Sequence, residues 1–189
     1  MVLVGTLVIL REERKEDLAK QVALRNDLDT QAWSKVLPPD FTYEMYEARF
    51  NKREFSFDRK DGKFSIISKE NDDYVGHISY SEYEDRFSAT IGIIVDKRYW
   101  GTGMAYDAQE VLLKFLFLEL GVRVVRLWTQ SGNQGAIKLA KKSGFQISGT
   151  IRHTVYMRGK INNILVVDLL REEYFARHPD LVDILPPLP

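Results

Sequence analysis

The middle of the chain, from about residue 89 to residue 145, alternates between stretches that favour strands and stretches that favour helices. The strand-like stretches are Ala89–Val95 and Val122–Thr129, and apolar residues at helical spacing follow them over about Gly103–Leu120 and Asn133–Ser143. A glycine ends each helix, at Gly121 and at Gly144. Because strands and helices alternate here, the sequence predicts one mixed sheet that is covered by helices.

Strands dominate the two flanks of this region. The expected strands are Val2–Leu10, Phe64–Lys69, Tyr74–Glu82 and a hairpin of Phe145–Met157 with Ile161–Arg171. Further helices are expected over about residues 11–29 and 43–53. We expect a single domain over residues 1–177, followed by an extended proline-rich tail over residues 178–189.

Composition excludes several kinds of protein. The 189 residues include 27 Lys and Arg and 27 Asp and Glu, so no net positive charge is available to hold nucleic acid non-specifically. The absence of cysteine excludes disulfides, cysteine zinc sites and a cysteine nucleophile. Three scattered histidines form no metal motif, and no metal is expected. The short apolar start lacks the features of a signal peptide or a membrane span, so we expect a cytoplasmic protein without a membrane partner.

The segment between the strand that ends at Val95 and the following helix carries two glycines, Gly101 and Gly103. A helix N-terminus presents unpaired N–H groups and the positive end of the helix dipole, and glycine lets a ligand come close to the backbone. These features predict a pyrophosphate site. No Gly-Lys-Ser/Thr follows, and Tyr106 stands where a dinucleotide fingerprint needs glycine, so neither of those motifs is present.

Further along, the chain reads Asn133-Gln-Gly-Ala136 and then Lys142-Ser-Gly144-Phe145. Together with the glycine loop, this sequence resembles the GNAT superfamily of N-acetyltransferases, and within it the ribosomal-protein N-terminal acetyltransferase (RimJ/RimL-like) branch. The family loop has Gln or Arg, two residues, then Gly-x-Gly/Ala. Gly103 and Ala105 match it, with Trp100 at the first position. An alternative alignment uses Arg98 as the basic residue. The resemblance covers about residues 7–175.

The resemblance implies the GNAT fold, an α/β (α+β) fold with one mixed, mostly antiparallel, splayed sheet of about seven strands and helices on both faces. It implies acetyl-CoA as cosubstrate and direct transfer of its acetyl group to a primary amine. The pantetheine arm would lie in the splay, and a backbone N–H there would stabilise the developing oxyanion. The implied cofactor-binding residues are Ile94, Val95, Trp100, Gly101, Thr102, Gly103, Met104, Ala105 and Asn133. Asn133 is also placed to cap the helix that follows it.

The usual catalytic residues of the family are absent. Thr90, Ala136 and Ala140 stand where Glu, Ser and Tyr are common. Glu82 is our candidate for the base and Tyr156 for the acid, and each also has an ordinary structural explanation, as a solvated carboxylate and a packed aromatic residue. Asp168 interrupts an apolar run and is read as facing a surface, and His77 as a strand residue with a satisfied ring.

Three functions compete for this sequence. The first is an N-acetyltransferase whose acceptor is a protein N-terminus, a polyamine or another small-molecule amine. Its acidic residues Asp40, Glu44, Glu47 and Glu54 could attract a cation. The second is an acyl-CoA-binding regulatory module with weak or lost catalysis. The third, an RNA-associated protein, is disfavoured by the zero net charge. A homo-oligomer is compatible with each of them.

Overall fold

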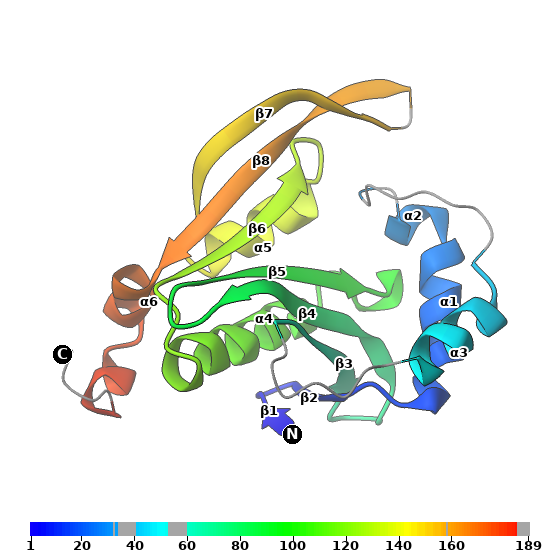
Figure 1. The fold of residues 1–189 in the computed structure, drawn as a ribbon, viewed down its shortest axis with the longest axis horizontal. Coiled ribbons are helices and arrows are strands. Elements are labelled where there is room, and N and C mark those ends of the chain that lie inside the picture. The colour runs from blue at the N-terminus through cyan, green and yellow to red at the C-terminus, as the bar shows by residue number, and fades with distance from the viewer. Residues whose placement is uncertain (32, 34–40, 53–59, 158, 185–189) are drawn as a thin grey trace.

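The computed structural model describes residues 1–31, 33, 41–52, 60–157 and 159–184, and its core is one eight-stranded sheet (Figure 1). In spatial order the strands are β1 (Val2–Val4), β2 (Val8–Glu12), β3 (Gly62–Ser68), β4 (Tyr74–Glu84), β5 (Ser88–Val95), β6 (Val124–Gln130), β8 (Lys160–Leu170) and β7 (Gln146–Met157). Every neighbouring pair is antiparallel except β5 and β6, which are parallel. The predicted mixed, mostly antiparallel sheet is therefore confirmed.

Helices cover both faces of this sheet. The helices are α1 (Leu18–Asn26), α2 (Leu28–Gln31), α3 (Tyr43–Asn51), α4 (Met104–Lys114), α5 (Gln134–Lys142) and α6 (Arg171–Arg177). Ile66 of β3 belongs to the large core cluster that holds the buried face of α4, whereas Ile67 packs with Leu24 of α1 and with Tyr74. Because successive strand residues point to opposite faces, α4 and α1 lie on opposite sides of the sheet.

The predicted first strand, Val2–Leu10, is two strands in the structure. The chain turns at residues 5–7, and the Asp107 carboxylate of α4 accepts hydrogen bonds from the N–H groups of Thr6, Leu7 and Val8 at 3.0, 2.7 and 2.9 Å. Gly5 permits this approach, since a Cβ there would lie 2.4 Å from an Asp107 oxygen. We call this contact the Asp107 clamp. Because this turn divides the predicted first strand into two, the sheet has eight strands where about seven were expected.

The segments on either side of the domain also differ from the sequence prediction. The predicted helix over residues 11–29 begins only at Leu18, because β2 continues to Glu12 and a short 3-10 turn follows. At the other end, Pro179–Ile184 forms a 3-10 helix, and Leu181 is buried in the core cluster. This part of the predicted tail is therefore helical and packed, because its leucine side chain finds an apolar site.

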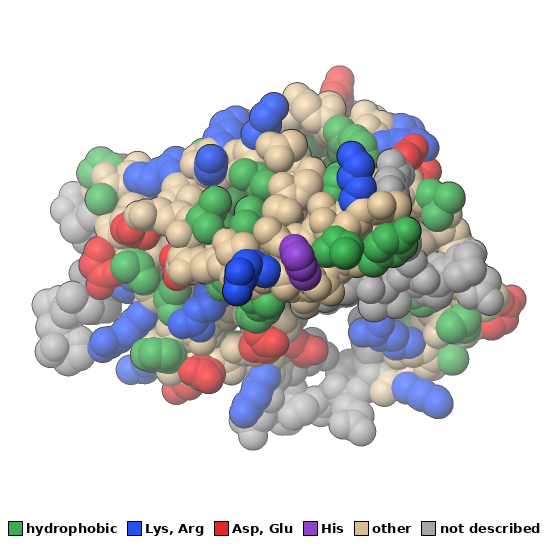
Figure 2. Space-filling view, turned by 90° about the horizontal axis from the view of Figure 1, so that it is seen from above, with side chains coloured by type: hydrophobic (Ala, Val, Ile, Leu, Met, Phe, Trp, Pro, Cys, Tyr) green, Lys and Arg blue, Asp and Glu red, His purple; other side chains and the backbone are tan. Residues whose placement is uncertain are grey.

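The β5–β6 pair opens after three residues. Only Ser88–Thr90 of β5 pair with Val124–Arg126 of β6, and beyond them the two strands diverge. The upper half of the sheet, β6, β8 and β7, then lies apart from the lower half (Figure 1). Seen from above, the face of the upper half mixes hydrophobic and basic side chains (Figure 2). The predicted splay is confirmed, and it is the feature that creates the site.

Candidate active site

A cavity of about 750 Å³ occupies the gap between β5 and β6. Its lining comes from β5 between Ile91 and Val95, from β6 between Leu127 and Thr129, from β4, from the glycine loop with α4, from α5, and from the end of α2 with Trp33. The cavity therefore extends from the glycine loop, at the open end of the splay, to the point where β5 and β6 separate. Such a long cleft suits an elongated ligand.

The glycine loop supplies unpaired donors at one end of this cavity. Gly101 and Gly103 have φ of 77° and 90°, values that glycine adopts without strain. Among the described residues, nothing accepts a hydrogen bond from the N–H groups of Gly101, Gly103, Ala105 or Tyr106. These groups stand at the positive end of α4, an 11-residue helix. The arrangement is suited to a phosphate-type anion.

Gln109 places a further donor beside this loop. Its side chain is 1 % exposed and lines the cavity, yet its Nε2 has no hydrogen-bond partner among the described residues. A buried amide without a partner is costly, so such groups are rare in folded proteins. The Gln109 side chain therefore places an unpaired buried N–H donor in this wall of the cavity.

The backbone of β5 presents polar groups to the gap. The N–H of Asp96 donates to the carbonyl of Val75 at 2.9 Å, and the pairing of β4 with β5 continues from there through Val95 and Ile94. Because alternate residues of an antiparallel strand bond to the partner, the backbone groups of Val95 and Ile93 point away from β4 and into the gap. The Trp100 indole reaches the Val95 carbonyl at 2.9 Å, which leaves the Val95 N–H for a ligand.

Asn133 has both of the roles that its position allows. Its Oδ1 accepts a hydrogen bond from the Ala136 N–H at 3.1 Å, so it is the N-cap of α5. It also lines the cavity.

Two other predicted cofactor residues do not line the cavity. These are Met104 and Thr102, and both the N–H and the hydroxyl of Thr102 donate to the Tyr99 carbonyl. Of the nine predicted residues, the structure places Ile94, Val95, Trp100, Gly101, Gly103, Ala105 and Asn133 on the cavity wall.

Glu82 lies where β5 and β6 begin to separate, next to Thr90, the last β5 residue that pairs with β6. A smaller cavity of about 270 Å³ adjoins the first, and it is lined by Glu82, Thr90, Ile91 and Trp128. Ile91 and Trp128 line both cavities, so the two spaces are neighbours. The Thr90 hydroxyl donates to Glu82 Oε2 at 2.7 Å. Thr90 therefore holds the carboxylate of the neighbouring strand beside the smaller cavity.

Comparison with known proteins identifies the architecture. Residues 8–146 match the acetyltransferase (GNAT) domain family. The chain belongs to the GNAT family. It is an acetyl-CoA-dependent N-acetyltransferase.

Individual GNAT proteins are similar to this chain in sequence or in fold. The uncharacterized N-acetyltransferase p20 of Bacillus licheniformis is 27 % identical over 122 residues, which cover 64 % of this chain and 68 % of p20. A GNAT acetyltransferase structure from Bacillus anthracis superposes with a TM-score of 0.77 at 21 % identity, covering 92 % of this chain and all of that one. A Vibrio cholerae spermidine N-acetyltransferase in complex with CoA and spermine gives 0.80 at 20 % identity, covering 90 % and 99 %.

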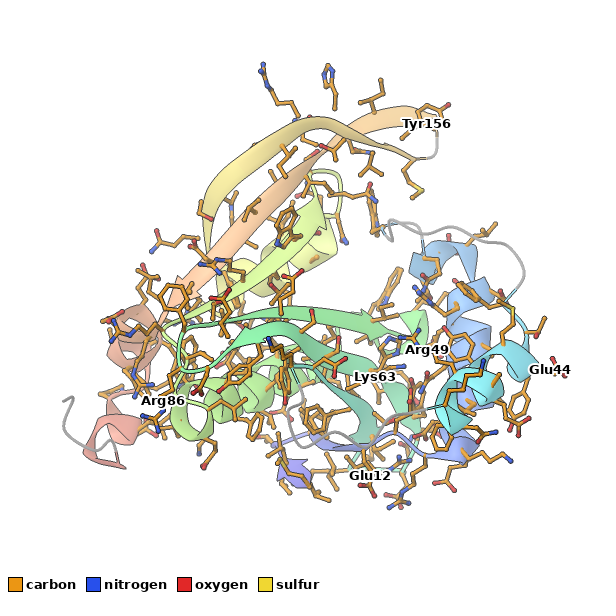
Figure 3. The ribbon with its side chains drawn as sticks, in the orientation of Figure 1. Glu12, Glu44, Arg49, Lys63, Arg86 and Tyr156 are labelled. Carbon is orange, nitrogen blue, oxygen red and sulfur yellow. The ribbon has the colours of Figure 1, made fainter. Side chains whose placement is uncertain are left out.

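The GNAT fold does not bring every predicted residue to the cavity. Tyr156 is 73 % exposed, lies near the outer end of the β7–β8 hairpin and lines neither cavity (Figure 3). The long hairpin carries it away from the splay, so its assignment as the acid is not supported. Of the acidic acceptor-side residues, Glu44 points outward (Figure 3) and Glu47 pairs with Lys15 at 2.7 Å, while Asp40 and Glu54 fall outside the described residues.

His77 has a larger part in the site than the sequence suggested. It lines the main cavity, and its Nδ1 lies 3.3 Å from the Tyr74 hydroxyl. Burial, together with the charges of Lys63, Arg25 and Arg49, lowers the pKa of His77 to about 3. The imidazole is therefore neutral at physiological pH and contributes a polar, uncharged wall.

Gln109 and Trp128 are cavity residues that the sequence prediction missed. Gln109 lies beside the buried stripe of α4 that contains Ala108 and Leu112, and a polar residue within such a stripe is a detectable signal. Trp128 alternates with buried residues along β6, and an aromatic residue on the outward face of a strand gives no comparable signal. Their positions at the site depend on the splay.

No helix within the described ranges is both long and apolar enough to cross a lipid bilayer.

Proposed function

We propose that this enzyme holds acetyl-CoA in the gap between β5 and β6 and acetylates a primary amine that enters beside Glu82. The observation that carries the proposal is the convergence of unpaired donors on one cavity. The loop N–H groups and the Val95 N–H face it, the Gln109 side chain lines it, and nothing among the described residues accepts a hydrogen bond from the loop groups or from Gln109 Nε2. These donors fit a ligand that has a diphosphate at one end and amide and thioester carbonyls along its length.

Different residues along the cavity bind different parts of acetyl-CoA. The N–H groups of Gly101, Gly103 and Ala105 hold the diphosphate, and Gln109 donates to a neighbouring oxygen of the cofactor. The Val95 N–H holds a carbonyl of the pantetheine arm, and the Ile93 N–H, which also points into the gap and lies nearer to Glu82 along β5, polarises the thioester carbonyl and stabilises the negative charge that develops on its oxygen. Trp100 anchors the next peptide group of the chain, because its indole N–H donates to the Val95 carbonyl at 2.9 Å.

Acetyl-CoA supplies the activated acetyl group. Glu82 binds the incoming ammonium and accepts one proton, so that the amine nitrogen gains a free lone pair. The nitrogen then forms a bond to the carbonyl carbon, the carbon–sulfur bond breaks, and the second ammonium proton passes through solvent to the departing thiolate. The Thr90 hydroxyl, 2.7 Å from Glu82 Oε2, holds the carboxylate in place during this exchange.

The acceptor is a small-molecule amine in this proposal. The Vibrio cholerae structure with spermine supports a small amine, and the resemblance to the ribosomal-protein branch supports a protein N-terminus. We favour the small molecule because the side cavity next to Glu82 has a volume of about 270 Å³, which suits a compact acceptor.

The test has a binding and a catalytic part. Acetyl-CoA and CoA should raise the midpoint of thermal unfolding, while ATP should not. At a hundredfold excess over Kd, a ligand adds about 2.7 kcal/mol of stability, or roughly 5–10 °C for a domain of this size. Glu82→Gln should slow acetyl transfer about 100-fold, as for loss of a general base, with unchanged acetyl-CoA affinity. Glu84→Gln, two residues along the same strand, is the matched control.

The outcomes separate the hypotheses. Acetyl-CoA binding without transfer to any amine would favour the acyl-CoA-binding regulatory module. Normal transfer by Glu82→Gln, with an unaltered pH–rate profile, would reject Glu82 as the base.

A further inference from the structure

The side cavity is built from an unusual backbone feature. Glu82 has a φ of 52°, in the left-handed region that a residue of this kind seldom adopts. The pairing of β4 with β5 shifts between Ser81 and Glu84, so Glu82 lies in a bulge. Bulges redirect side chains, and strained residues persist only where the surrounding structure holds them. Here the bulge and the Thr90 hydrogen bond aim the Glu82 carboxylate at the cavity.

Trp128 faces the same space from the other side of the splay. It follows Arg126 by two residues, and Arg126 is the register partner of Thr90. Because side chains two apart on a strand share a face, Trp128 and Thr90 lie on the same face of the sheet. The indole is 46 % exposed. A carboxylate and an aromatic face beside one cavity are the two groups that bind an ammonium ion best.

The charges of the surrounding wall favour an acceptor with one cation. Among the described residues that line the two cavities, Glu82 is the one carboxylate. His77 is neutral, and Lys142 lies at the α5 end, over the ring of Tyr106. The basic Arg126 is in register with Asp168 of β8, which carries the opposite charge. A second ammonium would lose its hydration without gaining a partner.

Next to Glu82 the wall consists of the Thr90 hydroxyl and of apolar surface from Ile91 and Trp128, which line both cavities. We propose that Glu82 and Trp128 form an ammonium subsite that selects a primary amine carried on a flat, apolar body, in preference to a polyamine. This inference rests on the proposed acetyl transfer and names its acceptor class. Trp128 is then the residue that determines acceptor specificity.

The experiment measures acetyl-CoA-dependent release of the CoA thiol with 2-phenylethylamine and with spermidine. Trp128→Leu should raise the KM for 2-phenylethylamine about fivefold to tenfold, and Trp128→Phe should raise it less, since phenylalanine keeps a weaker aromatic face. Trp100→Leu is the matched control, because it removes another exposed tryptophan of the same cavity, at the glycine-loop end. That variant should raise the KM for acetyl-CoA and leave the KM for the amine unchanged.

A neutral analogue separates charge recognition from simple packing. Glu82→Gln should leave inhibition by 2-phenylethanol unchanged. The same substitution should weaken the binding of 2-phenylethylamine to the enzyme–CoA complex. Transfer to spermidine with 2-phenylethylamine inert would overturn the subsite, as would an amine KM that Trp128→Leu leaves unchanged. Failure of the proposed function itself would look different, because no amine would then be acetylated and acetyl-CoA would not shift the unfolding midpoint.

Discussion

Replacing Gln109 with methionine should stabilise the free enzyme and weaken its binding of acetyl-CoA. The Gln109 Nε2 is buried without a partner among the described residues, and its side chain is 1 % exposed. A buried unpaired polar group costs about 1–3 kcal/mol. Methionine has a similar volume and shape without the amide, so it removes that cost with little repacking.

The magnitude follows from the size of the domain. A change of 1 kcal/mol moves the unfolding midpoint by roughly 2–4 °C in a domain of 150–250 residues. Taking the lower end of the amide's cost, we expect Gln109→Met to raise the midpoint by about 2–4 °C. Loss of one hydrogen bond to the ligand costs about 0.5–1.5 kcal/mol, so the Kd for acetyl-CoA should rise roughly twofold to tenfold.

Thermal unfolding gives the stability, and isothermal titration calorimetry gives the affinity. Gln21→Met is the matched control, because Gln21 is equally buried but fully paired: its Nε2 donates to Glu13 and its Oε1 accepts from Lys63 at 2.8 Å. That variant should lower the midpoint. A lower midpoint for Gln109→Met would show that the amide is satisfied in the free protein and would refute the reasoning. A higher midpoint with an unchanged Kd would show that the cofactor does not reach Gln109.

Three other predictions test the site and its support. Gly103→Glu should abolish the acetyl-CoA-dependent shift of the unfolding midpoint, because a carboxylate would enter the anion site, while Gly159→Glu, at another left-handed glycine with open space around it, should leave the shift intact. Asp107→Asn should lower the unfolding midpoint by roughly 2–6 °C and raise the acetyl-CoA Kd, since three N–H groups lose a charged acceptor. Equal Kd values for the variant and the wild type would show that the clamp does not support cofactor binding by the loop. The folded-state pKa of His77 is about 3, below its unfolded value near 6.5, so its neutral form contributes stability that is lost as the pH falls from about 6.5 towards 3. His77→Asn should therefore make the free energy of unfolding in urea depend less on pH in this range. An unchanged pH dependence would contradict the assignment.

The parts of the site that the sequence predicted are encoded locally. Gly101, Gly103 and Ala105 define a loop by their own conformational freedom, and Asn133 caps the helix that directly follows it. Both segments lie next to regular elements that the apolar spacing reveals. Their convergence on one cavity then follows from the order of strands and helices, which the resemblance supplied.

The parts that the sequence did not predict depend on distant contacts. The break within Val2–Leu10 is fixed by Asp107, about one hundred residues later, and the left-handed turn at Glu82 arises from a bulge against β5. The position of Tyr156 depends on the length and direction of the β7–β8 hairpin, which carry the side chain away from the splay. None of these properties leaves a periodic signal in the sequence.

The Asp107 clamp makes the beginning of the chain a reporter of cofactor occupancy. Leu7, whose N–H the clamp holds, would lie 3.4 Å from a Cβ at Gly103, so the turn of residues 5–7 supports the glycine loop from behind. Linkage is reciprocal: a ligand that orders the loop must also stabilise what the loop rests on. Deuterium uptake by the amides of Thr6, Leu7 and Val8 should therefore slow when acetyl-CoA binds, although none of these three residues lines the cavity.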